Sequence, residues 1–315
     1  MAGGTGGHVF PALACAELLQ AQGWGVQWLG TAKGIEARLV PQAGLTLHTL
    51  DIAGLRGNGL KGWLLLPWRL LKAVLVARRI LKQTQARVVL GMGGYASGPG
   101  AIAATLCGVP IVIHEQNAAA GLTNRVLSVL AKKALQGYEG ALKGATTVSN
   151  PVREVIFKAP AVRADANQAL KVLILGGSQG ALALNKQVPP ALAQVMAPLE
   201  VWHQTGKTDA AAAAVYEGLQ LGHTVKRTPF IDDMAAAYAW ADVVICRAGA
   251  LTCAELAASG RAAIFIPLPT AVDDHQTMNA MSHVRVGAGW LMPQAALTAD
   301  KLTAQLQTFA TDRAV

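Results

Sequence analysis

Two glycine-rich stretches contain residues whose type and spacing could do chemistry. The first, "GGTGGH", covers residues 3–8, and the second, "GGSQG", covers residues 176–180. Each leads into a segment predicted to be a helix, and the amide groups at a helix start lack internal partners and carry partial positive charge. Such a loop favours a phosphate group, although a glycine pair can also serve a tight turn alone. We therefore expect two phosphate-binding loops, with Thr5 and Ser178 in equivalent places.

Short apolar runs alternate with longer helical patterns, and these elements must position the two loops. Each run ends near Gly, Asn, Ser or Thr and is followed by a helix-like segment, which is typical of βα units in a parallel sheet. The chain is therefore predicted to be an α/β protein. The runs expected as strands are "GVQWLGT", "ARVVLGMGG", "GVPIVIHEQN", "LKVLILGGSQG", "LEVWHQTGK", "TVKRTPFI", "ADVVICRAGA" and "AAIFIPLP".

The alternation pauses once, between residues 149 and 169, where prolines and polar residues interrupt the pattern. A chain of 315 residues is long for one domain, because domains average about 150 residues. We therefore predict two Rossmann-like domains with parallel sheets facing across a cleft, residues 1–148 and 170–315, joined by a linker at 149–169.

Composition excludes several classes of protein. Hydrophobic residues make up 52% of the chain, but no uninterrupted run approaches the roughly 20 residues that a membrane-spanning helix needs, and no secretory signal is visible. The cysteines form no C-x-x-C pair, which argues against a zinc site or a disulfide framework and favours a reducing, cytoplasmic compartment. The strands ending "WLGT" and "WHQT" lack the acid of a dinucleotide dehydrogenase, and neither loop has the Gly-Lys-Ser/Thr ending of a nucleoside-triphosphatase.

The net charge of +9 is concentrated in the first half, where residues 52–114 include lysines and arginines but no acid. A helix expected to start near Pro67 places aliphatic residues on one arc and cations on the other. Cations mixed with exposed aliphatics and tryptophan suit an anionic membrane surface; a core helix covered by its own cation stems is the alternative. No nucleic-acid-binding motif accompanies the charge, so we expect no such partner. The residues expected at the membrane are Trp63, Leu64, Leu65, Trp68, Arg69, Lys72 and Arg79.

Further motifs occur in a fixed order along the chain. They are "GGTGGHVFPALA", "GLRGNGLKG", "VVLGMGGYASGPG", "HEQNAAAGLTN", "NPVR", "GGSQGA", "FIDDMAAAYAWADVVICRAGALTCAE" and "DDHQTMNA". With these motifs the sequence resembles, up to about Asn279, the family of UDP-N-acetylglucosamine:undecaprenyl-pyrophosphoryl-MurNAc-pentapeptide N-acetylglucosaminyltransferases of bacterial cell-wall synthesis.

The resemblance implies the GT-B fold and transfer of N-acetylglucosamine, with inversion, from UDP-N-acetylglucosamine to lipid I, forming lipid II. It further implies a peripheral enzyme at the cytoplasmic face of the inner membrane, serving peptidoglycan synthesis, cell shape and division beside other cell-wall proteins. No cofactor is implied.

The resemblance also implies roles for residues toward the sugar donor. Ser178 and Thr252 would lie at the diphosphate, and Glu255 would accept from the ribose hydroxyls. An ordinary helix acid at Glu255, a solvated charge at Arg153 and a strand end at Asn117 are the alternatives. The full set expected to bind the donor is Thr5, Gly6, Gly7, Asn117, Arg153, Ser178, Ile231, Ala250, Leu251, Thr252, Cys253, Ala254, Glu255, Gln276 and Asn279.

Our first candidate for the general base is His8, because the dipole at a helix start disfavours the imidazolium form. Capping of the helix, or contact with acceptor phosphates, is the alternative role. Glu115 and His114 in "HEQN" are further candidates for the base. The residues expected to contact the acceptor are His8, Gly94, Tyr95 and His114.

No D-x-D-like element or His/Asp cluster is evident, so we expect no tightly bound metal. The helix start after "GGSQG", Thr252 and Arg153 would then stabilise the departing diphosphate, with a magnesium ion from solution as the alternative.

The sequence departs from the family in three respects. The family has a strand directly before the first glycine loop and helices beyond the position of Val315, so we expect that strand and those helices to be missing. Ser149 stands where the family usually has Gly before "NPVR". Three other functions stay open: another GT-B enzyme such as a glycolipid transferase or UDP-sugar epimerase, an inactive UDP-sugar binder, and a dehydrogenase, which the missing acids disfavour.

Overall fold

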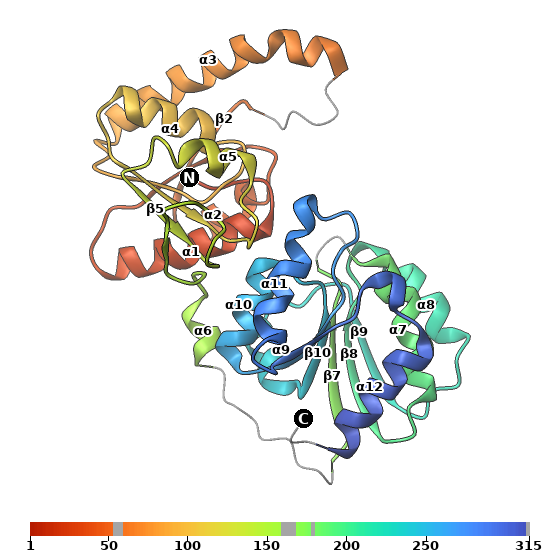
Figure 1. Ribbon diagram of the computed structural model, residues 1–315. Helices are drawn as coiled ribbons and strands as arrows, with labels where there is room; N and C mark the ends of the chain where they lie inside the picture. Colours follow the sequence, from red (N-terminus) through yellow and green to blue (C-terminus); the bar gives the residue numbers. More distant parts are fainter. Residues whose placement is uncertain (53–58, 159–167, 178–179, 313–315) are drawn as a thin grey trace. The chain divides into compact units, whose positions relative to one another are not determined.

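The structure is a computed structural model that describes residues 1–52, 59–158, 168–177 and 180–312, with backbone alone for 59–66 and 272. The chain divides into two compact units, Met1–Arg153 and Glu154–Val315, here called unit 1 and unit 2. Each unit contains parallel strands alternating with helices (Figure 1). The predicted α/β class is therefore confirmed.

In unit 1, each strand is followed by a helix or turn that returns the chain to the same edge of the sheet, as parallel pairing requires. Its elements are α1 Gly6–Ala21, β1 Gln27–Thr31, α2 Glu36–Gln42, β2 Thr46–Leu50, α3 Gly59–Gln83, β3 Val89–Gly91, α4 Ser97–Leu106, β4 Ile111–Glu115, α5 Leu122–Leu127, β5 Lys133–Gln136 and β6 Thr146–Thr147.

The strands of unit 1 form two separate parallel groups, β1-β2 and β3-β4-β5-β6. The backbone of Met1 lies against β3: its amino group donates to the Leu90 carbonyl at 2.7 Å, and its own carbonyl accepts from Met92 N–H at 2.9 Å. The first glycine loop follows directly, so this contact with β3 positions the loop at the carboxyl end of that strand.

Helix α3 buries the aliphatic arc that its sequence predicts. Ala73, Val74, Ala77 and Leu81 are buried in one core with β3, β4 and α4, whereas Trp68 is 69% exposed. The helix starts earlier than predicted, at Gly59, with Pro67 inside it. The missing Pro67 N–H removes one helical hydrogen bond, and the apolar turn before it continues the helical pattern.

Unit 2 repeats the same alternation over a longer sheet. Its elements are α6 Glu154–Phe157, β7 Leu170–Leu175, α7 Leu182–Gln194, β8 Leu199–Gln204, η1 Gly206–Thr208, α8 Asp209–Glu217, β9 Thr224–Thr228, α9 Met234–Trp240, β10 Val243–Cys246, α10 Ala250–Ser259, β11 Ala262–Phe265, η2 Val272–Asp274, α11 His275–Val284, β12 Gly289–Leu291, η3 Gln294–Ala296 and α12 Ala299–Thr311.

The six strands of unit 2 are ordered β12-β11-β10-β7-β8-β9 and all pair in parallel. Helices α7, α8 and α12 share one apolar core with the sheet, while α9, α10 and α11 lie together on its other face (Figure 1). Strands β7 and β10 are buried on both faces, which explains why they are continuous apolar runs rather than alternating ones.

All eight runs predicted as strands contain one, but β2, β5, β6 and β12 were not predicted. These four are short or carry exposed polar residues, so neither a long apolar run nor a clean alternation marks them.

Candidate functional site

The strand order of unit 2 selects one place for ligand binding. From β7 the chain moves outward to β8 and β9, then returns to β10 on the other side of β7 and moves outward again to β11 and β12. Ligands of open parallel sheets bind at the carboxyl ends of the strands where the direction reverses. The candidate site of unit 2 therefore lies at the loops that follow β7 and β10, whose described residues are 176–177, 180–181 and 247–250.

The loop after β7 has the backbone of a glycine turn. Gly177 and Gly180 have φ angles of +74° and +80°, and Gly180 N–H donates to the Gly177 carbonyl at 2.9 Å. Helix α7 begins at Leu182, without a side-chain cap or a first-turn acid. Ser178, predicted to contact a diphosphate, lies outside the described residues together with Gln179.

Gly180 is closely packed against the neighbouring loop after β8. A Cβ atom at Gly180 would meet Thr208 Oγ1 and would lie 2.8 Å from the Thr205 carbonyl oxygen, whereas a Cβ at Gly177 would meet nothing within 4 Å. We expect Gly180→Ala to lower the free energy of unfolding by about 3 kcal/mol, because positive φ and crowding both act there.

Gly177→Ala is the matched control, with an expected loss of about 1 kcal/mol from backbone strain alone. Urea unfolding of both variants measures the difference. Equal losses would contradict the packing described for Gly180.

A chain of buried polar side chains holds the loop after β8 in place. Asn185 Nδ2 donates to the Thr205 carbonyl at 2.9 Å and to Thr208 Oγ1 at 2.8 Å. Asn185 Oδ1 is 3.1 Å from His203 Nε2, and His203 Nδ1 is 3.0 Å from the Tyr216 hydroxyl. Burial lowers the pKa of His203 to about 4, so the ring is neutral at pH 7. Sequence reasoning missed this network, which links α7, β8 and α8 beneath the glycine loop.

Helix α10 supplies the second half of the unit 2 site. It starts after Gly249 with no side-chain cap and no acid in its first turn, so its first amides are available to an anion. Thr252 is partly exposed in that turn, and Leu251 and Ala254 are partly exposed beside it, while Ala250 and Cys253 are buried.

The Glu255 carboxylate is 5% exposed, one turn further along, and accepts from the Tyr238 hydroxyl at 3.0 Å. This contact ties α10 to α9. Ile231, expected to bind the donor, is buried just before α9.

Two side-chain amides expected to bind the donor, those of Asn279 and Gln276, also approach this loop. Asn279 is fully buried, and its Nδ2 donates to the Ala248 carbonyl at 3.1 Å, which ties α11 to the loop before α10. Gln276 Oε1 accepts from Leu268 N–H at 2.9 Å. Both amides therefore hold loop backbone at the carboxyl ends of β10 and β11.

Three loops meet at the carboxyl end of the unit 1 strands: the first glycine loop, the loop after β3 and the loop after β4. Gly93 and Gly94 have φ angles of +100° and +87°, and a Cβ at Gly94 would lie 2.8 Å from Gly3 N. Only glycine allows the loop after β3 to approach the first glycine loop this closely. Tyr95 is 52% exposed beside them. Thr5, Gly6 and Gly7 form the uncapped start of α1.

His8 lies in the first turn of α1, where the three loops meet. Its Nδ1 is 3.0 Å from Gln116 Oε1, and a Cβ at Gly93 would lie 2.7 Å from the same nitrogen. Gln116 Nε2 in turn contacts His114 Nδ1 at 3.2 Å. The structure thus brings together His8 and His114 through Gln116, a residue that sequence reasoning did not select.

The Glu115 side chain faces the opposite side of β4 from His114. Both of its carboxylate oxygens accept hydrogen bonds from the loop that follows β4. One carboxylate oxygen accepts from Asn117 N–H and Asn117 Nδ2, and the other accepts from Gly121 N–H and Asn124 Nδ2, at 2.8–3.2 Å. These four donors occupy both carboxylate oxygens, so Glu115 shapes the loop of residues 116–124.

Glu36 is a second buried carboxylate that sequence reasoning missed. Its oxygens accept from Gly4 N–H at 3.0 Å, Thr31 N–H at 3.0 Å and Thr31 Oγ1 at 2.7 Å. One amide of the first glycine loop is therefore satisfied inside the protein. The position of Glu36 in the sequence could have identified it as a site residue, because it follows the carboxyl end of β1 after one short turn.

Arg153, predicted to contact the donor, belongs to unit 1. Its guanidinium lies 5.4 Å from the centroid of the Phe10 ring on α1, a distance at which the cation and the ring attract.

Both units match domain families. Residues 1–136 match the glycosyltransferase family 28 N-terminal domain, and residues 171–314 match the glycosyltransferase family 28 C-terminal domain. The chain belongs to glycosyltransferase family 28. Membership confirms the predicted enzyme class, a glycosyltransferase.

Two family relatives show how much of the chain is shared. A protein of Aeromonas hydrophila is 54% identical over 315 residues, covering 98% of this chain and 87% of the relative. A protein of Alkalilimnicola ehrlichii is 54% identical, covering 99% of this chain and 89% of the relative. Both are named UDP-N-acetylglucosamine--N-acetylmuramyl-(pentapeptide) pyrophosphoryl-undecaprenol N-acetylglucosamine transferase.

Solved structures agree with the family 28 fold. The crystal structure of Acinetobacter baumannii MurG is 44% identical and superimposes with a TM-score of 0.84, covering 99% of this chain and 90% of that one. The glycosyltransferase of kitacinnamycin, at 17% identity and a TM-score of 0.69, shares the fold alone. The predicted GT-B architecture is confirmed.

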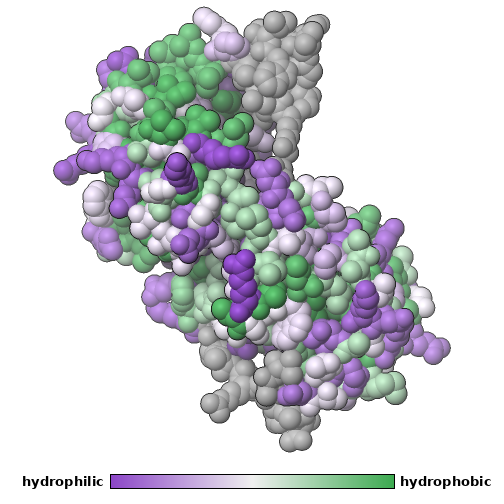
Figure 2. All heavy atoms as spheres, viewed as in Figure 1, coloured by the Kyte–Doolittle hydropathy of each residue, from purple (hydrophilic) through white to green (hydrophobic). Residues whose placement is uncertain are grey.

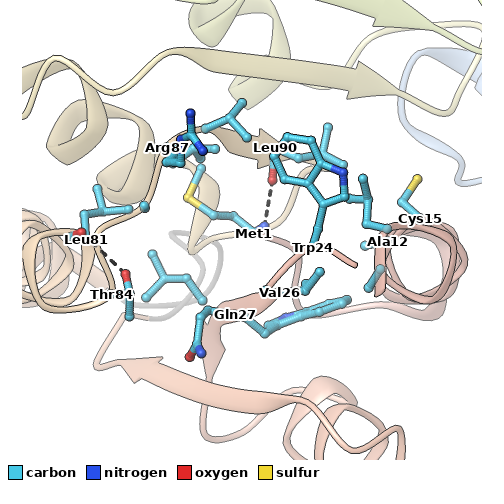
Figure 3. Close-up of a pocket in the computed structure, with 18 of the residues that line it drawn as sticks. Met1, Ala12, Cys15, Trp24, Val26, Gln27, Leu81, Thr84, Arg87 and Leu90 are labelled. Carbon is cyan, nitrogen blue, oxygen red and sulfur yellow. Dashed lines mark hydrogen bonds between the residues drawn. The ribbon is translucent and has the colours of Figure 1, made fainter. Parts of the chain in front are cut away.

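A cavity of about 540 Å³ lies in the family 28 N-terminal domain, between β1 and β3 (Figure 3). It is lined by Trp28 and Leu29 of β1, Val89 and Leu90 of β3, and Met1. The Met1 amino nitrogen is buried there although the side chain is partly exposed, and burial lowers the pKa of this amino group to about 5.

Exposed apolar side chains gather over α3 and α4 in the same domain (Figure 2). On α3, Trp68, Leu71 and Leu75 are 69%, 49% and 55% exposed, and they alternate with exposed cations that include Arg69, Lys72 and Arg79. Within the described residues, no helix has the length and apolarity to cross a membrane. Trp63, Leu64 and Leu65 belong to α3, but their side chains lie outside the described residues.

Proposed function

We propose that the chain transfers N-acetylglucosamine from UDP-N-acetylglucosamine to lipid I, forming lipid II for peptidoglycan synthesis. The observation that carries this proposal is the 54% identity, over 98% of the chain, to an Aeromonas hydrophila protein whose name states this reaction. The likeness extends through both family 28 domains. It therefore covers both the domain proposed to bind the acceptor and the domain proposed to bind the donor. Such an activity would serve cell-wall growth, and through it cell shape and division.

The donor half of the proposal is supported by the loops of unit 2. The uncapped start of α10 and the glycine turn after β7 flank the point where the strand order reverses. Amide groups at such a point favour a diphosphate, because their partial positive charge is fixed in direction. Thr252 would add a hydroxyl, and Ile231, Glu255 and Gln276 would complete the nucleotide-sugar site.

The acceptor half is supported by the loops of unit 1. In the proposed step, a hydroxyl oxygen of the lipid-linked sugar bonds to the anomeric carbon of N-acetylglucosamine while the bond from that carbon to UDP breaks. His8 Nε2 takes the hydroxyl proton, and the electron pair of the broken bond leaves with the diphosphate. Gly94 and Tyr95 would hold the acceptor near this histidine. Inversion follows, because the attack displaces UDP directly.

The deciding experiment is transfer of labelled N-acetylglucosamine to a lipid I analogue by the full chain, with and without a chelator. Formation of a labelled lipid II analogue in both arms supports the proposal and a reaction without tightly bound metal. Loss of product on chelation alone points to a divalent ion that assists the diphosphate. Transfer to diacylglycerol, or epimerised UDP-sugar without an acceptor, would replace the proposal with the corresponding enzyme. If the chain binds UDP but forms no product under any of these conditions, the proposal would be replaced by that of an inactive UDP-sugar binder.

We also propose that α3 binds the anionic cytoplasmic surface of the inner membrane, which would bring unit 1 to its lipid-linked acceptor. The exposed tryptophan and leucines of α3 would enter the boundary between headgroups and acyl chains, while the cations beside them attract anionic lipids. Binding to an anionic membrane surface requires both apolar side chains and cations, and α3 carries both kinds of side chain in exposed positions.

We expect the double substitution Leu71→Ser and Leu75→Ser to weaken binding to phosphatidylglycerol-containing vesicles about tenfold, because two apolar side chains lose their burial in lipid. Cosedimentation at low and high salt measures the affinity and its electrostatic part. Leu18→Ser is the matched control, since Leu18 is 54% exposed on α1 of the same unit. Equal loss in both proteins would remove α3 from the binding surface.

A further inference from the structure

Gln116 connects two histidines at the carboxyl end of β4, and the direction of each hydrogen bond follows from its partners. His114 and Gln116 are two residues apart and therefore share one side of the chain, while Glu115 faces the other. Gln116 Nε2 is 3.0 Å from the His114 carbonyl oxygen, which can only accept. This contact orients the amide with its NH₂ group toward His114 and its oxygen toward His8.

The tautomer of His114 supports the same orientation. His114 Nε2 is 2.9 Å from the Ser149 carbonyl oxygen, so this nitrogen carries a hydrogen atom. Burial lowers the pKa of His114, which favours the neutral ring. His114 Nδ1 therefore has a lone pair, and it accepts from Gln116 Nε2 at 3.2 Å. Both amide hydrogens of Gln116 are thus used on the His114 side.

Only the oxygen of the Gln116 amide then faces His8. Gln116 Oε1 is 3.0 Å from His8 Nδ1, and an amide oxygen can only accept, so His8 Nδ1 carries a hydrogen atom. In the neutral His8 ring the lone pair must then be on Nε2, the nitrogen that would face a reacting hydroxyl. Gly93 packs against the Nδ1 edge, where a Cβ would lie 2.7 Å from the ring.

We infer that Gln116 is a positioning residue that fixes His8 in the Nδ1–H tautomer, so that Nε2 presents its lone pair as the proton acceptor. The inference rests on the proposed function only for its effect on rate. The hydrogen bonds form a chain from the Ser149 carbonyl through His114 and Gln116 to His8, and each bond has one hydrogen atom and one acceptor. Without Gln116, the ring can rotate or adopt the opposite tautomer, which places a hydrogen atom where the lone pair is needed.

The test combines nitrogen NMR of the full chain with steady-state kinetics. With ¹⁵N-labelled histidine, the chemical shifts of His8 distinguish a protonated Nδ1 from a protonated Nε2, and His8→Ala identifies the signal. In the unsubstituted protein we expect Nδ1–H. In Gln116→Leu we expect the Nδ1–H signature to be lost, kcat to fall about 10- to 100-fold, and KM for both substrates to change by less than about twofold.

Two further variants separate positioning from a general loss of structure. Gln136→Leu removes another buried glutamine in unit 1, whose amide contacts Thr147 and Leu142 instead of a histidine. We expect it to leave the His8 tautomer and kcat unchanged. Gln116→Glu keeps an oxygen acceptor for His8 Nδ1–H, so we expect it to retain the Nδ1–H signature.

An Nε2–H signature for His8 in the unsubstituted protein overturns the inference, whether or not any variant folds. An unchanged tautomer in Gln116→Leu does so as well. If the tautomer behaves as expected but the unsubstituted chain transfers no sugar, the positioning role stands and the proposed function fails.

Discussion

Replacing His8 with alanine is expected to lower kcat for sugar transfer by about 10²- to 10⁴-fold, the range that a positioned general base contributes. The ring lies at the meeting point of three loops, and its Nδ1 is held by Gln116. KM for UDP-N-acetylglucosamine is expected to change little, because His8 is not among the residues expected to bind the donor and most of those residues belong to unit 2. Initial rates at saturating and limiting donor, with a lipid I analogue as the acceptor, measure both constants.

His48→Ala is the control for the loss of an imidazole from unit 1, since His48 lies on β2 and contacts Gln27. We expect this variant to keep its rate. Added imidazole should restore part of the rate in His8→Ala, because the substitution leaves room for a free base. A His8→Ala enzyme within about threefold of the unsubstituted rate would show that another group takes the proton.

The second large effect concerns stability and pH. An amino terminus in water has a pKa of about 8, and burial lowers the pKa of the Met1 amino group to about 5 in the folded chain. Between these values the unfolded state binds a proton that the folded state does not, so stability rises with pH from about 5 to 8 and is constant above that range. The full difference in unfolding free energy is about 4 kcal/mol, since each pKa unit corresponds to roughly 1.4 kcal/mol.

Comparison of the chain with a free Met1 amine and the same chain acetylated at Met1 isolates this effect. His203, whose pKa burial lowers to about 4, also makes stability rise with pH, but only below about pH 6.5. Urea unfolding at about pH 6.5 and about pH 8 therefore reports the amine, with an expected gain of about 2 kcal/mol at the higher pH for the free amine alone. Equal gains in the two proteins would mean that the amine is solvated in the folded state.

Periodicity was sufficient to predict the strands that carry the site. Strands such as β7 and β10 are buried on both faces and therefore appear as unbroken apolar runs, "VLIL" and "VVIC". β2 escaped prediction because its residues are mostly part-exposed or exposed, as in "TLHTL". Such strands are recognised by their pairing partners, which a local pattern does not contain.

The predicted site residues were harder to interpret than to find. His8 and Gly94 do lie in one loop cluster, because glycine loops at strand ends have a place that the fold dictates. The role of Gln116 depends on a contact with His8 across 108 residues of sequence, and the hydrogen bond from Gly4 to Glu36 spans 32 residues. Contacts that span so much of the sequence do not follow from local spacing, so they became visible only in the three-dimensional structure. The alternation in "HEQN" did hold a usable signal, since residues two apart in a strand face the same side.

The divided strands of unit 1 have a consequence for handling the protein. Strand β1 pairs with a described strand on one side only, and the other side of β3 is hydrogen-bonded to the backbone of Met1. Apolar side chains line the space between β1 and β3. Backbone edges of this kind recruit extended segments of other molecules. Self-association is therefore expected to increase with protein concentration and to start at the open edge of β1.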